Sequence, residues 1–278
     1  MNAGLALSRS ALVGICGNDS LQELLPAGSA RNALDCALWE LEAKLSSRAA
    51  WQIAELEKPH SVLTTFTCGA DTPEKMAATA LRYQKDWNAQ AIRLKLTGES
   101  IDADRVRAVR DARPDVWVAV DANQGFLRES LNRLLPVLMD ARVALIEQPF
   151  PIGHESPLDG LQSPIPIAAD ESVQRLSDIP SVVGRFKVVN IKLDKFGGLT
   201  EGLAMARASR EIRLEPMVGN MLGTSLAMAP AFLVGHLCNV TDLDEPGFLK
   251  SDRTITVDYI DGKILCRDEL WGAADSFD

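Results

Sequence analysis

The sequence has few aromatic residues, few cysteines and no long apolar stretch. Aromatic side chains make up 5% of its 278 residues, whereas hydrophobic residues in total reach 46%, enough for a large core in a chain of this length. No apolar stretch approaches the roughly 20 residues that a membrane-spanning helix requires, so we expect no membrane association. Lys and Arg total 29 against 38 Asp and Glu. This balance disfavours a nucleic-acid partner held through its phosphates.

Recognisable cysteine, targeting and nucleotide motifs are also missing. The five cysteines are scattered without a Cys-x-x-Cys pair, so neither a zinc site nor a disulfide framework is predicted. The first sixteen residues carry Arg9 within their apolar run and no basic segment before it, which is not typical of a signal peptide. No Gly-x-Gly-x-x-Gly motif follows a predicted strand, which disfavours a dinucleotide-binding domain. We therefore expect a cytoplasmic protein with reduced thiols.

The hydrophobic pattern changes character near residue 60. Residues 1–60 show apolar side chains at helical spacing, whereas short runs rich in Val and Ile alternate with helix-length segments beyond them. The predicted strands are Val62–Thr67, Ala91–Leu96, Val116–Val120, Val143–Ile146, Ile165–Ala169, Val188–Ile191, Leu214–Val218 and Leu237–Thr241. Helices are predicted at Pro73–Trp87, Ile101–Asp111, Leu127–Asp140, Leu199–Arg210 and Thr224–Leu233. Eight such units predict an α/β fold with a (β/α)8 TIM barrel over residues 61–245, and a doubly wound open sheet is the alternative.

An ionisable residue closes each of five successive predicted strands. In chain order these residues are Lys95, Asp121, Glu147, Asp170 and Lys192, spaced 22 to 26 residues apart. Because that spacing is one βα unit, all five side chains should stand at the carboxyl end of the barrel, where barrel enzymes place their chemistry. A single Asp after a strand is more often a helix cap, but a set of five in one register favours a functional site.

The order of these charges suggests proton chemistry beside a cation. Three carboxylates on adjacent strands would repel one another, and Mg²⁺ is a hard cation that suits an all-oxygen site. A metal that binds a substrate carboxylate stabilises the enediolate formed when the α-proton leaves, and a lysine whose pKa the cation lowers can accept that proton. Arg93 shares the strand face of Lys95 and should point into the same site, whereas Lys195 lies beyond the strand end and is interpreted as structural or as a support for the site residues.

These residues resemble the enolase superfamily in its muconate-lactonizing-enzyme-like branch. That branch carries Lys-x-Lys on the second barrel strand, and this chain has Arg93-Leu-Lys95, with arginine in place of the first lysine. Three further segments match the metal-ligand motifs and one the sixth-strand lysine motif: Val-Asp121-Ala-Asn123, Ile-Glu147-Gln-Pro, Ala-Asp170-Glu-Ser and Asn-Ile-Lys192-Leu-Asp-Lys195. The resemblance implies Lys95 and Lys192 as catalytic bases and a Mg²⁺ cofactor on Asp121, Glu147 and Asp170.

Other segments resemble the dipeptide epimerases of this superfamily, notably the L-Ala-D/L-Glu epimerases. They are residues 25–39 and 217–227, and the Asp242-Leu-Asp244 segment after the eighth strand. The resemblance implies that Asp242 and Asp244 bind the α-ammonium group of a dipeptide, a charge-assisted contact, and we assign Arg93 to substrate binding with them. The implied reaction is epimerisation by two-lysine proton transfer.

Two alternatives keep the same fold. An o-succinylbenzoate synthase or cycloisomerase would use the same metal and lysines, but its substrate has no ammonium group for the Asp-x-Asp pair. A metal- or ligand-binding barrel without turnover is the second alternative. A homo-oligomer is compatible with the sequence, which does not define the oligomeric state.

The resemblance departs from the family at the N-terminus. The family's capping domain opens with a β-meander, whereas this chain begins almost directly before the capping helices. We therefore expect residues 1–60 to form a truncated, mainly helical capping region without that meander. Residues 246–278, with a predicted hairpin formed by Thr254–Tyr259 and Lys263–Leu265 around Asp261-Gly262, are expected to return to the cap.

Overall fold

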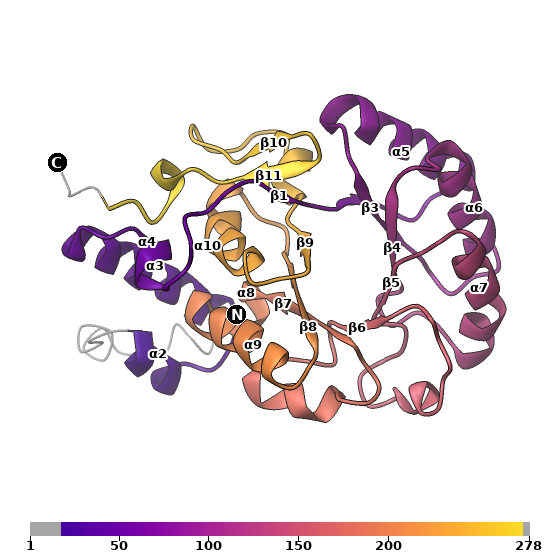
Figure 1. The fold of residues 1–278 in the computed structure, drawn as a ribbon, viewed down its shortest axis with the longest axis horizontal. Helices are drawn as coiled ribbons and strands as arrows, with labels where there is room; N and C mark the ends of the chain where they lie inside the picture. Colours follow the sequence, from indigo (N-terminus) through magenta and orange to yellow (C-terminus); the bar gives the residue numbers. More distant parts are fainter. Residues whose placement is uncertain (1–17, 275–278) are drawn as a thin grey trace.

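Eight parallel strands form one sheet that curves into a ring (Figure 1). The structure is a computed structural model that describes residues 18–274. The strands follow the chain order and are β2 (Phe66–Cys68), β3 (Ala91–Lys95), β4 (Trp117–Asp121), β5 (Leu145–Glu147), β6 (Ile167–Ala169), β7 (Val188–Lys192), β8 (Glu215–Gly219) and β9 (Val240–Asp242). Thr65, just before β2, donates its backbone N–H to the Thr241 carbonyl of β9 at 2.9 Å, so the first and last strands lie side by side. The predicted (β/α)8 barrel is confirmed, and the open-sheet alternative is wrong.

Helices cover the outer side of the ring (Figure 1). They are α5 (Pro73–Trp87), α6 (Asp102–Ala112), α7 (Arg128–Asp140), α9 (Leu199–Glu211) and α10 (Ser225–Gly235), each close to its predicted position. α5 begins as its sequence dictates, with Thr72 accepting from the Lys75 N–H and Pro73 in the first turn. The units after β5 and β6 carry only the short 3-10 segments η2 (Ser156–Leu158) and η3 (Leu176–Val182). None of the helices described between residues 18 and 274 is long and apolar enough to cross a membrane.

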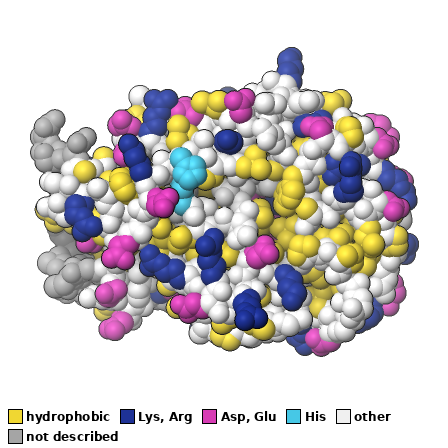
Figure 2. Space-filling view, in the orientation of Figure 1, with side chains coloured by type: hydrophobic (Ala, Val, Ile, Leu, Met, Phe, Trp, Pro, Cys, Tyr) yellow, Lys and Arg dark blue, Asp and Glu magenta, His cyan; other side chains and the backbone are white. Residues whose placement is uncertain are grey.

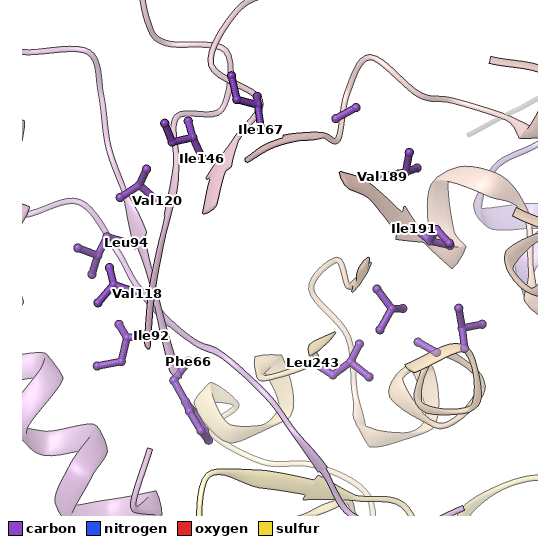
Figure 3. Close-up of a cluster of buried hydrophobic side chains, with 14 of the residues drawn as sticks. Phe66, Ile92, Leu94, Val118, Val120, Ile146, Ile167, Val189, Ile191 and Leu243 are labelled. Atoms are coloured by element: carbon purple, nitrogen blue, oxygen red, sulfur yellow. The ribbon is translucent and has the colours of Figure 1, made fainter. Parts of the chain in front are cut away.

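Alternation along the strands divides their side chains between helices and lumen. Figure 3 shows one set on the outer side of the ring, facing the helices: Phe66, Ile92, Leu94, Val118, Val120, Ile146, Ile167, Val189, Ile191 and Leu243. The other set faces the lumen. Farther from the carboxyl ends of the strands, this lumen set is a separate apolar cluster of Ala119, Leu145, Ala168, Val188 and Met217. Since residues two apart share a face, the next lumen side chains after Ala119, Leu145 and Ala168 are Asp121, Glu147 and Asp170, whereas Asn190 lies between Val188 and Lys192.

Within residues 18–274, three helices precede the barrel, and a small antiparallel sheet stands beside it. The helices are α2 (Asn18–Leu24), α3 (Ser29–Ser46) and α4 (Ala50–Ile53). The sheet has the order β1 (Val62–Leu63), β11 (Lys263–Leu265) and β10 (Asp258–Ile260). The strand predicted over Val62–Thr67 is therefore two strands. Its first half pairs with the C-terminal hairpin, and Thr64 marks the change by donating its N–H to the Gly262 carbonyl at 3.0 Å.

The C-terminal segment contacts the N-terminal helices after leaving the barrel. It passes through η4 (Glu245–Phe248) and η5 (Asp268–Leu270) and reaches α3, where Trp271 Nε1 donates to the Cys36 carbonyl at 3.2 Å. The Ala50 N–H of α4 donates to the Gly272 carbonyl at 2.9 Å. The first sixteen residues, for which no targeting role is predicted, lie outside the described residues.

The described surface and thiols agree with the composition. Basic and acidic side chains are interspersed over the face shown in Figure 2, with apolar side chains between them. The cysteines at positions 36, 68, 238 and 266 are free thiols.

Candidate active site

The strand register brings the charged residues to one level of the barrel. Lys95 is the Cα partner of Asp121, which is in turn the partner of Glu147. On the far side, Lys192 is the partner of Gly219, and Gly219 of Asp242. Parallel pairing of short strands with matched ends therefore places predicted residues from β3, β4, β5, β7 and β9 around the same mouth.

The two lysines stand on opposite sides of this mouth. β3 is the second and β7 the sixth of the eight barrel strands, so half the ring separates them. Lys95 Nζ lies 2.6 Å from Asp121 Oδ2 and 2.8 Å from Asn123 Oδ1. Lys192 Nζ lies 2.6 Å from Asp170 Oδ2, and Lys192 is 6% exposed. Each lysine thus has its own carboxylate partner.

The electrostatic environment differs between the carboxylates. Burial raises the pKa of Glu147 to about 8, with the Asp121 charge adding to the rise. Burial alone would also raise the pKa of Asp170, but Lys192 and Lys195 outweigh it and hold that pKa below its usual range. The pKa of Lys192 is raised, because Asp170 and Glu147 outweigh the effect of burial. The lowered lysine pKa expected from the sequence is therefore not found at Lys192 with these neighbours.

Arg93 occupies the centre of the carboxylate group. Its Nη1 lies 2.8 Å from Asp242 Oδ2, 3.1 Å from Glu147 Oε2 and 3.6 Å from Asp121 Oδ2, and the residue is 4% exposed. Nη2 donates to Thr67 Oγ1 at 3.1 Å. The arginine side chain points into the site, as its strand face predicts, and its described partners are carboxylates and a hydroxyl of the chain itself.

Asp242 and Asp244 are both fully buried, but they differ in their partners. Asp242 accepts from the Thr65 hydroxyl and pairs with Arg93. Asp244 accepts from the Thr67 N–H at 2.5 Å through Oδ2, and its Oδ1 accepts no hydrogen bond from the described residues. Burial raises the pKa of Asp244 to about 7, and the Asp242 charge contributes to the rise. Asp242 Oδ2 also accepts no hydrogen bond but is paired with Arg93, so among the described residues Asp244 is the one of the two without an ion pair.

The donor set of Asp121, Glu147 and Asp170 has the chemistry of a Mg²⁺ site. All three are carboxylates, and burial, with the Asp121 charge adding to it, raises the pKa of Glu147, so a divalent cation would stabilise its ionised form. Within residues 18–274, however, no three acidic, His or Cys side chains are grouped as a formed metal site. The carboxylates are instead bonded to the chain's own lysines and arginine.

Four further residues support the site and were not assigned from the sequence. Asn190 Nδ2 donates to Glu147 Oε1 at 2.6 Å, and Asn123 accepts from Lys95. Gln148 Oε1 accepts from the Asp170 N–H at 2.9 Å. Lys195, interpreted as structural, donates to Asp170 Oδ1 at 2.5 Å. Asn190 could have been found, because it lies two residues before Lys192 and so shares its strand face.

A cavity of about 720 Å³ adjoins this region. It lies between the α2–α3 connection and the segment after β6, and its lining includes Pro26, Arg31, Gln174, Arg175 and Lys195. The volume is in the range of small-molecule pockets.

A parallel (β/α)8 barrel that gathers lysines and carboxylates at its strand ends defines an enzyme suited to acid–base chemistry. The family model described as "Enolase C-terminal domain-like" matches residues 75–266, and the chain belongs to this family, in the enolase superfamily. Curated relatives that are 38% and 40% identical to it are an epimerase and a racemase, so the chain is an isomerase.

Two curated relatives are epimerases or racemases. The N-acetyl-D-glutamate racemase of Pseudoalteromonas sp is 40% identical over 90% of this chain and 78% of its own length. The L-Ala-D/L-Glu epimerase of Escherichia coli K12 is 38% identical over 88% of this chain and 76% of its own length.

Two solved structures extend this similarity. An enolase family member from Agrobacterium tumefaciens with homology to dipeptide epimerases, solved with sodium and L-Ala-L-Glu, is 37% identical with a TM-score of 0.90 over 97% of this chain and 81% of its own. The dipeptide epimerase of Cytophaga hutchinsonii, complexed with Mg and D-Ala-L-Val, is 25% identical with a TM-score of 0.82 over 89% and 70% of the two chains.

Proposed function

We propose that this enzyme epimerises a dipeptide at an α-carbon with Lys95 and Lys192 as its two bases. One lysine removes the α-proton, and the other delivers a proton to the opposite face of the carbon. The observation that carries the proposal is their placement on opposite sides of one mouth, with carboxylates between them. An epimerase must remove the proton from one face of the carbon and deliver another to the opposite face. One base cannot easily serve both faces of a fixed substrate, whereas two lysines half a barrel apart can.

Asp121, Glu147 and Asp170 are the residues that would hold Mg²⁺. When bound, the cation would supply electrostatic stabilisation for the negative charge that develops on the substrate carboxylate as the α-proton leaves. The dipeptide epimerase of Cytophaga hutchinsonii was solved in complex with Mg, which supports Mg²⁺ as the cation. Asn190 would orient Glu147 and Lys195 would orient Asp170, since each donates to an oxygen of that carboxylate.

We assign Asp244 to bind the ammonium group of the dipeptide. Its free Oδ1 and its burial favour a charged donor, because a buried carboxylate is stabilised by a hydrogen-bonded cation. Asp242, already paired with Arg93, would shape the pocket from the neighbouring strand end.

The test is proton exchange on a dipeptide library. L,L-dipeptides in D₂O with Mg²⁺ should lose their α-proton NMR signal at the epimerised residue and give the L,D product. The Lys95→Ala and Lys192→Ala proteins should give no epimer. Absence of exchange for every dipeptide with the wild-type enzyme, or epimer formation by either lysine variant, would reject the proposal.

Racemisation of an N-acylated amino acid is a second candidate. The pairing of Asp242 with Arg93 favours it, because it leaves less negative charge for an ammonium group, and the racemase relative from Pseudoalteromonas sp acts on such a compound by its name. Comparison of L-Ala-L-Glu with N-acetyl-glutamate at equal concentration separates the two. Faster turnover of the free dipeptide supports the first function, and faster turnover of the acylated amino acid supports the second.

A further inference from the structure

Buried polar contacts join helix α3 to the segment that follows β7. This segment, residues 193–201, begins directly after Lys192 and contains α8 (Leu193–Phe196) and the start of α9. Arg31 of α3 is 5% exposed, and its Nε donates to the Gly197 carbonyl at 3.2 Å. Its Nη2 donates to the Phe196 carbonyl and pairs with Glu201. One guanidinium therefore holds both ends of the turn between α8 and α9.

Asp35, one turn further along α3, caps the N-terminus of α9 from outside. The residue at the cap position of α9 is Gly198, which has no side chain to accept from the free N–H groups of the first turn. Asp35 Oδ2 accepts from the Thr200 N–H at 3.0 Å, and the carboxylate is completely buried. A carboxylate at a helix N-terminus also interacts favourably with the helix dipole.

The two glycines of the turn allow α3 to approach this closely. Gly197 and Gly198 have φ angles of 90° and 123°, which favour glycine. A Cβ atom on Gly197 would lie 2.2 Å from Arg31 Nε, and one on Gly198 would lie 2.3 Å from Asp35 Oδ2. The conformation of the turn and the two side chains of α3 are therefore matched to each other.

The contact of α3 with residues 193–201 is linked to the candidate site through the Asp170 carboxylate, which accepts from both Lys192 and Lys195. Lys192 donates to Asp170 Oδ2 at 2.6 Å, and Lys195 within α8 donates to Asp170 Oδ1 at 2.5 Å. A shift of α8 would move Lys195, and with it the carboxylate that locates Lys192. Lys95 is held instead by Asp121 and Asn123 at the end of β4, which is three strands from the Lys192 strand β7.

We propose that Arg31 and Asp35 are positioning residues for Lys192 and leave Lys95 unaffected. Proton transfer on the Lys192 face of the substrate then depends on the contact of α3 with residues 193–201, and transfer on the Lys95 face does not. This inference rests on the proposed two-lysine function. It assigns a role in the reaction to a helix that lies outside the barrel.

The experiment measures α-proton exchange from each epimer separately in D₂O. The Lys95→Ala and Lys192→Ala proteins first identify which epimer each lysine deprotonates. In Arg31→Met and Asp35→Ala, exchange from the Lys192 epimer should fall about tenfold, because small displacements of a reacting group are costly. Exchange with retention from the Lys95 epimer should stay within about twofold of the wild type, since that base keeps its partners. Ala43→Gly, a destabilising change near the far end of α3, is the matched control and should leave the ratio of the two exchange rates unchanged.

Peptide-level amide hydrogen exchange provides a readout that does not need activity. In the Arg31 and Asp35 variants, the amide hydrogens of residues 193–201 should exchange faster than in the wild type. Those of residues 91–97 should exchange at the wild-type rate. Should Arg31→Met fail to fold, Arg31→Lys retains a charge near Glu201 but loses the forked contact, and it should show the same asymmetry at smaller size.

An equal loss of exchange from both epimers, or no loss from either, would overturn the positioning role. Exchange from neither epimer with the wild-type enzyme is a different result, which would overturn the proposed function itself.

Discussion

The guanidinium of Arg93 lies 2.8 Å from a carboxylate oxygen of Asp242, so an ion pair links the second barrel strand to the last, which lie on either side of β2. Both residues are buried, and the same nitrogen reaches Glu147 at 3.1 Å. Because a guanidinium does not lose its proton in proteins, this cation is permanent. It compensates buried acidic groups that would otherwise repel one another.

Removal of this cation should destabilise the fold. Arg93→Met leaves Asp242 and Glu147 buried without their charge partner, and the free energy of unfolding should fall by about 3 kcal/mol or more. Chemical denaturation measures the change. Arg107→Met is the control, because its pair with Asp104 is exposed and should contribute less than about 1 kcal/mol. Equal effects of the two substitutions would contradict a central role for Arg93.

Magnesium should stabilise the wild-type protein and not the carboxylate variants. A ligand that binds only the folded state at 100 times its Kd adds about 2.7 kcal/mol to the free energy of unfolding. Thermal unfolding with and without Mg²⁺ should show this gain, and it should be lost in Glu147→Gln and Asp170→Asn. Asp104→Asn, at an exposed position, should keep it. A full gain in either site variant would remove that residue from the metal site.

The lysines near Asp170 should separate by function. Lys192→Ala should abolish epimerisation but still exchange the α-proton of one epimer, and Lys95→Ala should do so for the other epimer. Lys195→Ala should remain able to epimerise, with exchange slowed only from the Lys192 epimer, because Lys195 holds Asp170 and is not itself proposed as a base. NMR of each epimer in D₂O distinguishes these outcomes. Normal epimerisation by Lys192→Ala together with an inactive Lys195→Ala would transfer the base role to Lys195.

Asp244 should make stability depend on pH. Its pKa is raised from 3.8 to about 7 by burial, with Asp242 contributing, so between these values the folded state binds a proton that the unfolded state has lost. The stabilisation from this proton is present near pH 4 and disappears as the pH rises through 7. Asp244→Asn, which cannot ionise, should lose less free energy of unfolding between pH 4 and 7 than the wild type does. Denaturation curves across this range measure the difference, and parallel curves for the two proteins would contradict the raised pKa.

Most of the barrel could be predicted because its signals are local. Short apolar runs closed by one charged residue recur at βα-unit spacing, and parallel pairing then sets Lys95 beside Asp121 and Asp121 beside Glu147. Strand alternation likewise turns Arg93 toward the lumen. Local pattern was insufficient for Val62–Thr67, where the choice of pairing partner splits one apolar run into β1 and β2.

The sequence by itself thus determined the fold class, the strand ends and the residue types gathered at the mouth, since each depends on periodicity and spacing along a short stretch of chain. Only the tertiary structure decided which charges neutralise one another. Arg93 meets Asp242 because the ring closes, and Asp35 caps α9 because α3 packs against the turn after β7. Such partners lie far apart in sequence, and ion pairs and trans caps are fixed by short distances that only the folded chain brings about.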